Sequence, residues 1–100
     1  MVLEVAVLDV VTGRGQAFEA AFREAQGILA ASPGYVSHEL LACVERRDRY
    51  LLLVRWETLE DHTHGFRRSP AYARWKALLH PFYDPFPEVQ HYTPIAGVSR

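Results

Sequence analysis

Cysteine pairs, long apolar runs and an excess of one charge are all missing from this sequence of 100 residues. The single cysteine, Cys43, can form neither a disulfide within the chain nor a thiolate metal cage. Apolar runs such as 51–54 are far shorter than the ~20 residues that a membrane helix needs. Eleven basic residues against twelve acidic ones give a formal net charge of −1. The sequence therefore lacks the basic field with which proteins bind nucleic acid or anionic membranes.

The N-terminus also lacks the features of a secretory signal, since Glu4 and Asp9 interrupt its apolar residues and no basic segment precedes them. We therefore expect a cytoplasmic protein with a reduced cysteine. Glycine and proline are scarce, with six of each, and hydrophobic residues make up 49%. This composition is typical of a folded globular domain. We expect one domain over residues 1–100, with its core within about 2–95 and a short tail over 96–100.

Hydrophobic periodicity divides the chain into strands and helices. Alternating or continuous apolar residues predict strands, and an apolar stripe at i, i+3, i+4 and i+7 predicts a long first helix. Ser69 followed by Pro70 is a strong start signal for the last helix. The expected strands are 2–10, 35–45, 49–57 and 88–95, and the expected helices are 16–30, 58–67 and 69–80. This order predicts the α+β class: a ferredoxin-like βαββαβ fold with a four-stranded antiparallel sheet.

The strands 2–10 and 49–57 are apolar on both alternating faces. The helices of a βαββαβ unit cover only one face of its sheet, and no residues remain to cover the other. A bare face would be a larger apolar patch than a monomer usually exposes. We therefore expect a two-fold symmetric homodimer that packs through the open sheet faces, which is a dimeric α+β barrel.

Three segments carry a resemblance to a known family. The sequence Leu53-Val54-Arg55-Trp56-Glu57-Thr58-Leu59-Glu60, followed by Phe66-Arg67-Arg68-Ser69-Pro70, resembles the antibiotic biosynthesis monooxygenase (ABM) family. Pro33-Gly34-Tyr35 is similar to the break before that family's second strand, and 87–92 is similar to its closing strand. The resemblance covers most of the chain, from about residue 2 to residue 95. It implies the same fold, whereas the family's members differ in chemistry.

The resemblance also implies a site between the sheet and the helices. Trp56 matches a tryptophan that frames this site in the polyketide-oxidising members. Their asparagine, tyrosine and arginine positions fall on Leu52, His62 and Lys76. The family's chemistry uses no metal, flavin or other cofactor: a deprotonated substrate donates an electron to dioxygen, and the radical pair recombines at carbon. By this comparison Trp56 is a stacking wall, His62 the base and Lys76 the cation beside a phenolate.

Helical spacing adds residues that we expect to bind the substrate. His62 and Phe66 share one face of the short helix, and Tyr72, Lys76 and Leu79 share one face of the next. Together with Leu52 they would enclose a planar phenolic or quinol-like molecule. The same residue types have ordinary roles as well: tryptophan and tyrosine at helical spacing are common in cores, and lysine is common on surfaces.

Other functions stay open at this point. The leucine at position 52 favours a non-catalytic dimeric protein that binds a small molecule or serves in stress response. A haem-degrading activity would need an axial histidine near position 76, where only His80 is close. A third reading is an isomerase or a lactone-handling enzyme, which needs a base without oxygen chemistry. A two-histidine, one-carboxylate iron site is a further alternative, although His38 is expected at the dimer interface and His91 on another strand.

Overall fold

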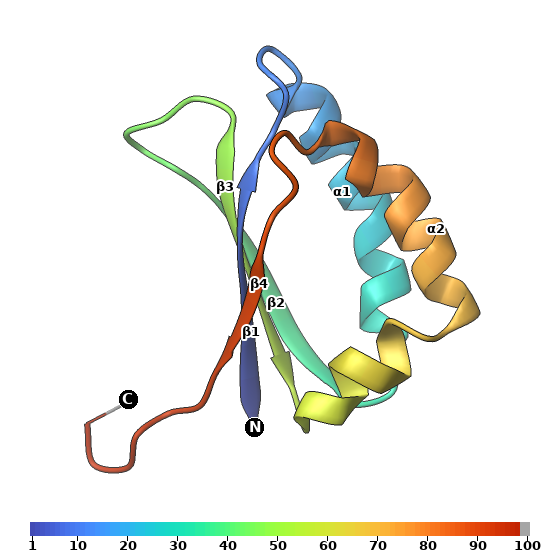
Figure 1. Ribbon diagram of the computed structural model, residues 1–100, viewed down its shortest axis with the longest axis vertical. Helices are drawn as coiled ribbons and strands as arrows, with labels where there is room; N and C mark the ends of the chain where they lie inside the picture. The colour runs from blue at the N-terminus through green and yellow to red at the C-terminus, as the bar shows by residue number, and fades with distance from the viewer. Residues whose placement is uncertain (99–100) are drawn as a thin grey trace.

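The helices of this chain lie on one face of a four-stranded antiparallel sheet (Figure 1). The computed structural model describes residues 1–98. Its strands are β1 (Val2–Asp9), β2 (Tyr35–Ala42), β3 (Arg49–Trp56) and β4 (Val89–Tyr92). Its helices are α1 (Gly15–Ala30), the π-helix η1 (Asp61–Phe66), α2 (Pro70–Leu79) and the 3-10 helix η2 (His80–Phe82). The strand order β2-β3-β1-β4 confirms the expected ferredoxin-like α+β fold.

The pairing of β1 with both of its neighbours places Glu4 in the middle of the sheet. β1 pairs with β3 over its full length, with Val2 opposite Trp56. On its other side β1 pairs with the short β4, where Glu4 lies opposite His91. Directly opposed residues of antiparallel strands point to the same face of the sheet. The register therefore brings Glu4, Trp56 and His91 to the face that the helices cover.

The long helix α1 seals this face with the apolar stripe that the sequence predicts. Phe18, Phe22, Ala25 and Leu29 are all buried against the sheet. Each phenylalanine or leucine buried in this way stabilises the fold by roughly 1.5–3 kcal/mol. α2 packs beside α1 and begins where expected, since the Ser69 side chain accepts the Tyr72 backbone N–H at 3.3 Å. The two helices leave the sheet only partly covered near β4.

A glycine turn fixes the start of η1, the helix that carries His62. Gly34 has a φ of +82°, and a Cβ at this position would collide with the Asp61 carboxyl group. Asp61 in turn accepts the Thr58 backbone N–H at 3.1 Å and the Thr58 hydroxyl at 2.9 Å. Glycine is needed here because the backbone is left-handed and the carboxylate occupies the space of a side chain. η1 is thereby held against the end of β2.

Some local expectations differ from the structure. The segment expected as helix 58–67 is a π-helix of six residues. β4 is shorter than the expected strand 88–95, because Pro87 and Pro94 flank it and proline cannot donate to a strand ladder. A register shift between Tyr35 and Ser37 breaks the alternation of β2. His38 consequently faces the helices, where its Nε2 lies 3.0 Å from Oε1 of Gln26 in α1, and not the open face as expected.

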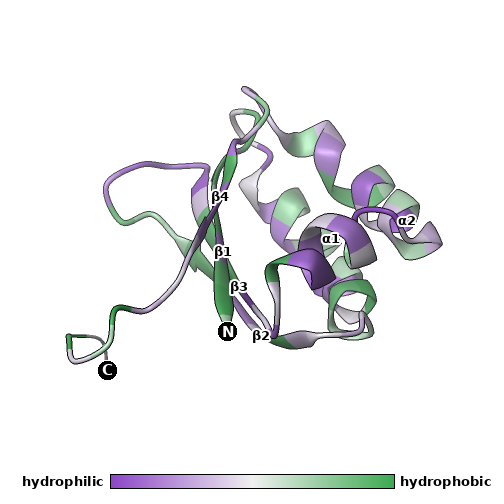
Figure 2. Ribbon diagram, turned by 60° about the horizontal axis from the view of Figure 1, so that its bottom comes forward, coloured by the Kyte–Doolittle hydropathy of each residue, from purple (hydrophilic) through white to green (hydrophobic). Residues whose placement is uncertain are grey.

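In the described part of the chain no helix covers the second face of the sheet, as Figure 2 shows from the side. This face carries apolar side chains. Val7, Leu41 and Tyr92 are about half exposed, at 45%, 44% and 51%. Leu51 and Leu53 of β3 point to the same face, since they alternate with the buried residues of that strand. Within residues 1–98, none of the helices has the length and the apolar character that a membrane crossing requires.

Candidate active site

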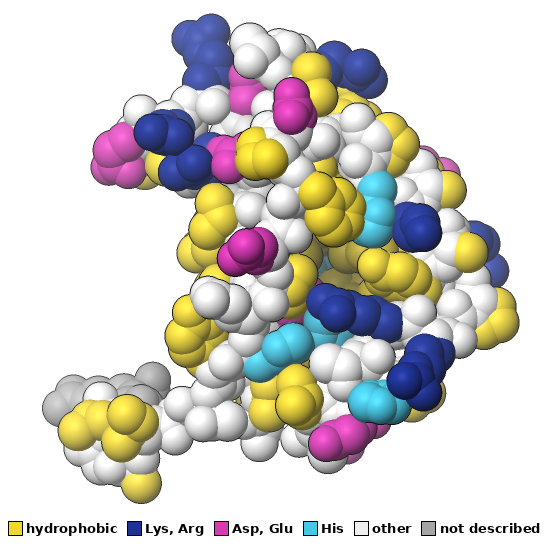
Figure 3. Space-filling model, viewed as in Figure 1, with side chains coloured by type: hydrophobic (Ala, Val, Ile, Leu, Met, Phe, Trp, Pro, Cys, Tyr) yellow, Lys and Arg dark blue, Asp and Glu magenta, His cyan; other side chains and the backbone are white. Residues whose placement is uncertain are grey.

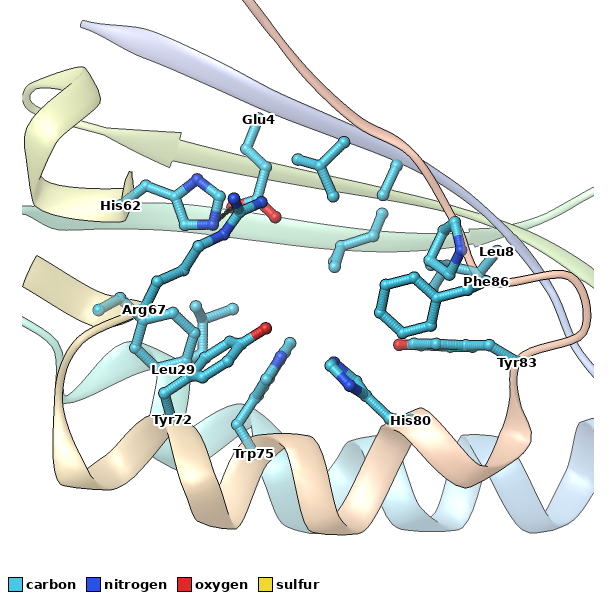
Figure 4. Close-up of a pocket in the computed structure, with 15 residues that line it drawn as sticks. Glu4, Leu8, Leu29, His62, Arg67, Tyr72, Trp75, His80, Tyr83 and Phe86 are labelled. Carbon is cyan, nitrogen blue, oxygen red and sulfur yellow. Dashed lines mark ion pairs between the residues drawn. The ribbon is translucent and has the colours of Figure 1, made fainter. Parts of the chain in front are cut away.

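A cavity of about 370 Å³ opens between the sheet, α2 and the segment that joins α2 to β4. Its wall is largely aromatic, with Phe66, Tyr72, Trp75, Tyr83 and Phe86 contributing rings (Figure 4). Figure 3 shows the hollow from the open side, with apolar side chains inside it and basic and histidine side chains at its rim. The volume lies near the lower end of the ~300–1,000 Å³ that small-molecule sites span. The cavity is therefore suited to a small planar molecule.

Glu4 is the acidic group at one end of this cavity. Its side chain points from β1 into the hollow, although the residue is only 7% exposed (Figure 4). The Trp56 Nε1–H group donates a hydrogen bond of 2.9 Å to Glu4 Oε1. Burial raises the pKa of the Glu4 carboxyl group, while the hydrogen bond from Trp56 and the charge of Arg67 oppose that rise. A carboxyl group that holds its proton beyond the ordinary range is suited to acid–base chemistry.

His62 links Glu4 to a second histidine. Its Nε2 lies 3.3 Å from Glu4 Oε1, and its Nδ1 lies 2.8 Å from His91 Nε2. The imidazole is stacked on the Trp56 indole and is 3% exposed. Burial lowers the pKa of His62 to about 3, and the charges of Arg67 and His91 act in the same direction. The ring is therefore neutral at pH 7, and its contact with Glu4 is a close polar contact and not an ion pair.

The opposite end of the cavity holds His80 and Tyr83, whose polar atoms point inward (Figure 4). Burial and the nearby Lys76 charge lower the pKa of His80. Burial also raises the pKa of the Tyr83 hydroxyl group, so that this group is a neutral donor at pH 7. Arg67 reaches across the Glu4 end and lines the same cavity. The cavity thus combines two polar ends with an apolar middle.

Comparison with known proteins identifies the family. The family model described as "Antibiotic biosynthesis monooxygenase" matches residues 1–78. This chain belongs to the antibiotic biosynthesis monooxygenase family. It is 55% identical to the uncharacterised protein YczJ of Bacillus subtilis over 92% of this chain and 97% of that protein. The expected family membership is thereby confirmed.

Solved structures agree with the ABM assignment. A protein of Bordetella bronchiseptica that carries the family's name has a TM-score of 0.90 and 30% identity, over 94% of this chain and 96% of that one. SnoaB of Streptomyces nogalater, described as a cofactor-independent oxygenase, has a TM-score of 0.79 and 22% identity, over 99% of this chain and 97% of that one. The second likeness shows a shared fold alone.

Four of the residues expected at the ABM site line the cavity: Leu52, His62, Phe66 and Tyr72. The remaining three do not. Trp56 is fully buried behind Glu4 and His62, so it supports polar groups and is no wall of the cavity. Leu79, the last residue of α2, is fully buried in the core. Lys76 follows Trp75 by about 100° around the helix and lies exposed on its outer side.

The cation at the cavity is accordingly Arg67, and not the lysine expected from the ABM resemblance. Sequence reasoning missed Arg67 together with Glu4, His80 and His91. Glu4 offered the clearest signal, because it is a carboxylate with apolar neighbours on both sides in the first half of β1. The two histidines come from separate segments, and only the fold shows which of them meets His62. In residues 1–98, no group of three histidine, cysteine or carboxylate side chains is arranged to hold a metal ion.

Proposed function

We propose that this ABM protein is a cofactor-independent monooxygenase that oxidises a small aromatic, phenolic or quinol molecule with dioxygen. The observation that carries the proposal is the buried Glu4 carboxyl group at the end of a cavity with aromatic walls. Aromatic walls bind a planar ring, and the polar end meets its hydroxyl group. The expected substrate is smaller than a polycyclic molecule, in keeping with the cavity volume of about 370 Å³.

The chemistry requires one deprotonation and the exclusion of bulk water. The phenol O–H bond breaks and its proton leaves, so that the anion can transfer one electron to dioxygen. The resulting radical and superoxide combine to a peroxide at carbon. The peroxide is then protonated, and cleavage of its O–O bond together with the C–H bond at the same carbon releases water and leaves a carbonyl group, with one oxygen atom in the product and the other in water. Arg67 stabilises the anion by its charge, since this guanidinium lines the cavity beside Glu4.

Oxygen uptake tests this proposal. The metal-chelated protein is supplied with a panel of single-ring quinols and phenols, and dioxygen consumption is followed with an electrode. We expect saturable uptake that falls at least 100-fold in Glu4→Gln, which keeps an acceptor for Trp56 but cannot take a proton. Lys76→Ala is the matched control, because this side chain lies outside the cavity. Equal turnover in Glu4→Gln and the wild type would contradict the assigned site.

The proposal includes a homodimer that forms through the open face of the sheet. Apolar side chains of β1, β2, β3 and β4 meet on that face, and a second copy offers an identical apolar surface. A two-fold interface would bury both surfaces at once. This arrangement leaves the cavity free, because the cavity lies on the helix side of the sheet.

A non-catalytic binding protein is the second candidate. Leu52 favours it, because this apolar side chain lines the cavity where the resemblance expects an amide. The two candidates differ in one measurement: a binding protein would retain a quinol, as isothermal calorimetry reports, without consuming dioxygen.

A further inference from the structure

We propose that Glu4, His62 and His91 form a proton relay that carries one proton from a phenol in the cavity to the surface and returns one later. The relay deepens the proposed function and rests on it, because the oxidation of a phenol needs a deprotonation in a buried place. It assigns His91, which lies outside the cavity wall, a part in the reaction as a positioning residue.

Close polar contacts connect the three groups in one line. Among residues 1–98, the two polar partners of the Glu4 carboxyl group both meet Oε1: Trp56 Nε1 at 2.9 Å and His62 Nε2 at 3.3 Å. Oε2 is therefore left for a molecule in the cavity, into which the carboxyl group points (Figure 4). His62 Nδ1 continues the line to His91 Nε2 at 2.8 Å. His91 is only half-buried, so the line runs from the cavity to the solvent.

The backbone holds these groups in place from three directions. Glu4 and His91 are opposed residues of β1 and β4, so the sheet register sets their spacing. His62 reaches over them from η1, and its ring is clamped against Trp56 with centroids 5.4 Å apart and planes 19° apart. A relay needs such fixed contacts, because a proton moves between a donor and an acceptor only when the two atoms are held close together.

The surrounding charges decide how the proton can move. Arg67 is the cation that faces Glu4, His62 and His91, and the phenol groups of Tyr72 and Tyr83 line the same cavity. A second positive charge on either imidazole would be repelled by Arg67 in a poorly solvated place. Both rings therefore stay neutral, and the proton must pass by exchange of tautomers.

One balanced step meets these conditions. At the start Glu4 is protonated on Oε1 and donates to His62 Nε2, His62 Nδ1–H donates to His91 Nε2, and His91 Nδ1–H donates to water. The phenol then gives its proton to Oε2, and each proton along the line moves to its acceptor. The phenol O–H bond is broken and one proton appears in water. Glu4 remains a neutral acid, now protonated on Oε2, and hydrogen-bonds to the phenolate.

The same line works in reverse after oxygen has been added. A proton from water enters at His91, and the Oε2 proton of Glu4 passes to the peroxide anion. Both imidazoles then return from the Nε2–H to the Nδ1–H tautomer. The raised pKa of Glu4 and the lowered pKa of His62 suit this cycle, because neither group has to carry a charge.

Nitrogen NMR of protein with labelled histidine tests the relay without any turnover. We expect His62 and His91 to share one tautomer in the free protein. With bound 4-nitrophenol, a chromogenic phenol, both rings should change together from Nδ1–H to Nε2–H at the pH where the bound phenol ionises. Opposite tautomers, an imidazolium at either position between about pH 6 and 8, or no response to 4-nitrophenol would overturn the relay.

Oxygen uptake separates this inference from the proposed function. In weak buffer we expect His91→Phe and His91→Gln to lower turnover about 10-fold or more, and added imidazole to restore it. His64→Phe is the control, because this exposed histidine contacts Thr63 and not the cavity. Unchanged turnover in both His91 variants would overturn the relay and leave the oxygenase. Paired tautomers that switch with 4-nitrophenol, in a protein that consumes no dioxygen, would instead remove the oxygenase and leave the relay.

Discussion

The indole of Trp56 and the imidazole of His62 lie face to face, with ring centroids 5.4 Å apart and planes 19° apart. The indole N–H group, at the edge of this stack, donates to Glu4. Trp56 thus orients two polar groups at the cavity while it is itself fully buried. Its role is to hold the site together, whereas the family resemblance alone suggested contact with a substrate.

Trp56→Phe should therefore damage stability and turnover together. Phenylalanine keeps a ring beside His62 but removes the donor to a buried carboxyl group, at a cost of about 1–3 kcal/mol. Urea unfolding measures that cost, and oxygen uptake measures the second effect. Trp75→Phe is the matched control, since Trp75 lines the cavity and has no part in the contacts of Glu4. A larger loss of turnover in Trp75→Phe than in Trp56→Phe would count against the supporting role.

The sequence predicts the fold correctly, because the patterns that indicate its helices and strands involve residues that are close together in the chain. The stripe of Phe18, Phe22, Ala25 and Leu29 depends only on helical spacing, and the structure buries all of these residues. The start of α2 at Ser69 and Pro70 follows from capping, which involves a few adjacent residues. Such patterns need no knowledge of distant contacts.

The sequence predicts only part of the candidate site, because the contacts in that site join segments that are far apart in the chain. His62 and Phe66 were found through helical spacing, and both line the cavity. The contact between His62 and His91 depends on the register of β4 and on the π-helical turn of η1, and neither has a local signature. The resemblance indicates Lys76 as the cation, whereas the structure places Arg67 at the cavity, for the same reason. Only the packing of the helices decides which of the two side chains points toward the cavity.

The lowered pKa of His62 predicts that the protein becomes less stable as the pH falls. The raised pKa of Glu4 has the opposite effect on stability, so Glu4 must be replaced before the effect of His62 can be measured. A folded-state pKa of about 3 against 6.5 means that the unfolded chain binds more protons between these values, so stability falls as pH falls. The raised pKa of Glu4 has the reverse sign, because stability is then lost as pH rises through the folded pKa. The Glu4→Gln background removes this opposing contribution.

In that background we expect His62 to contribute a loss of roughly 2–3 kcal/mol of unfolding free energy between pH 6.5 and pH 4.5. Adding His62→Phe should flatten this dependence, because no buried imidazole is left at that position. Adding His64→Phe should leave it unchanged, since that histidine is exposed. Urea titrations at the two pH values provide the measurement, and parallel losses in both double variants would show that another group carries the effect.

Gly34→Ala should destabilise the fold at the start of η1. Alanine at a φ of +82° carries a backbone penalty of ~1 kcal/mol or more, and its Cβ would also collide with the Asp61 carboxyl group. Gly13→Ala is the matched control, because Gly13 has the same φ with nothing within 4 Å of an added Cβ. We expect Gly34→Ala to be less stable than Gly13→Ala by at least ~1 kcal/mol in urea unfolding, and to be the one that lowers oxygen uptake.

Val7→Glu should dissociate the proposed dimer. Val7 lies on β1 opposite Leu51 and is 45% exposed on the open face, so a glutamate there would place an unpaired charge in the apolar two-fold interface. The charge would point to solvent in a monomer, which leaves the fold intact. Sedimentation over a range of protein concentrations should give a dimer for the wild type and for Ala20→Glu, whose substitution lies on the exposed surface of α1. A monomeric wild type would contradict the proposed dimer, and a Val7→Glu variant as dimeric as the wild type would place the interface elsewhere than on this face.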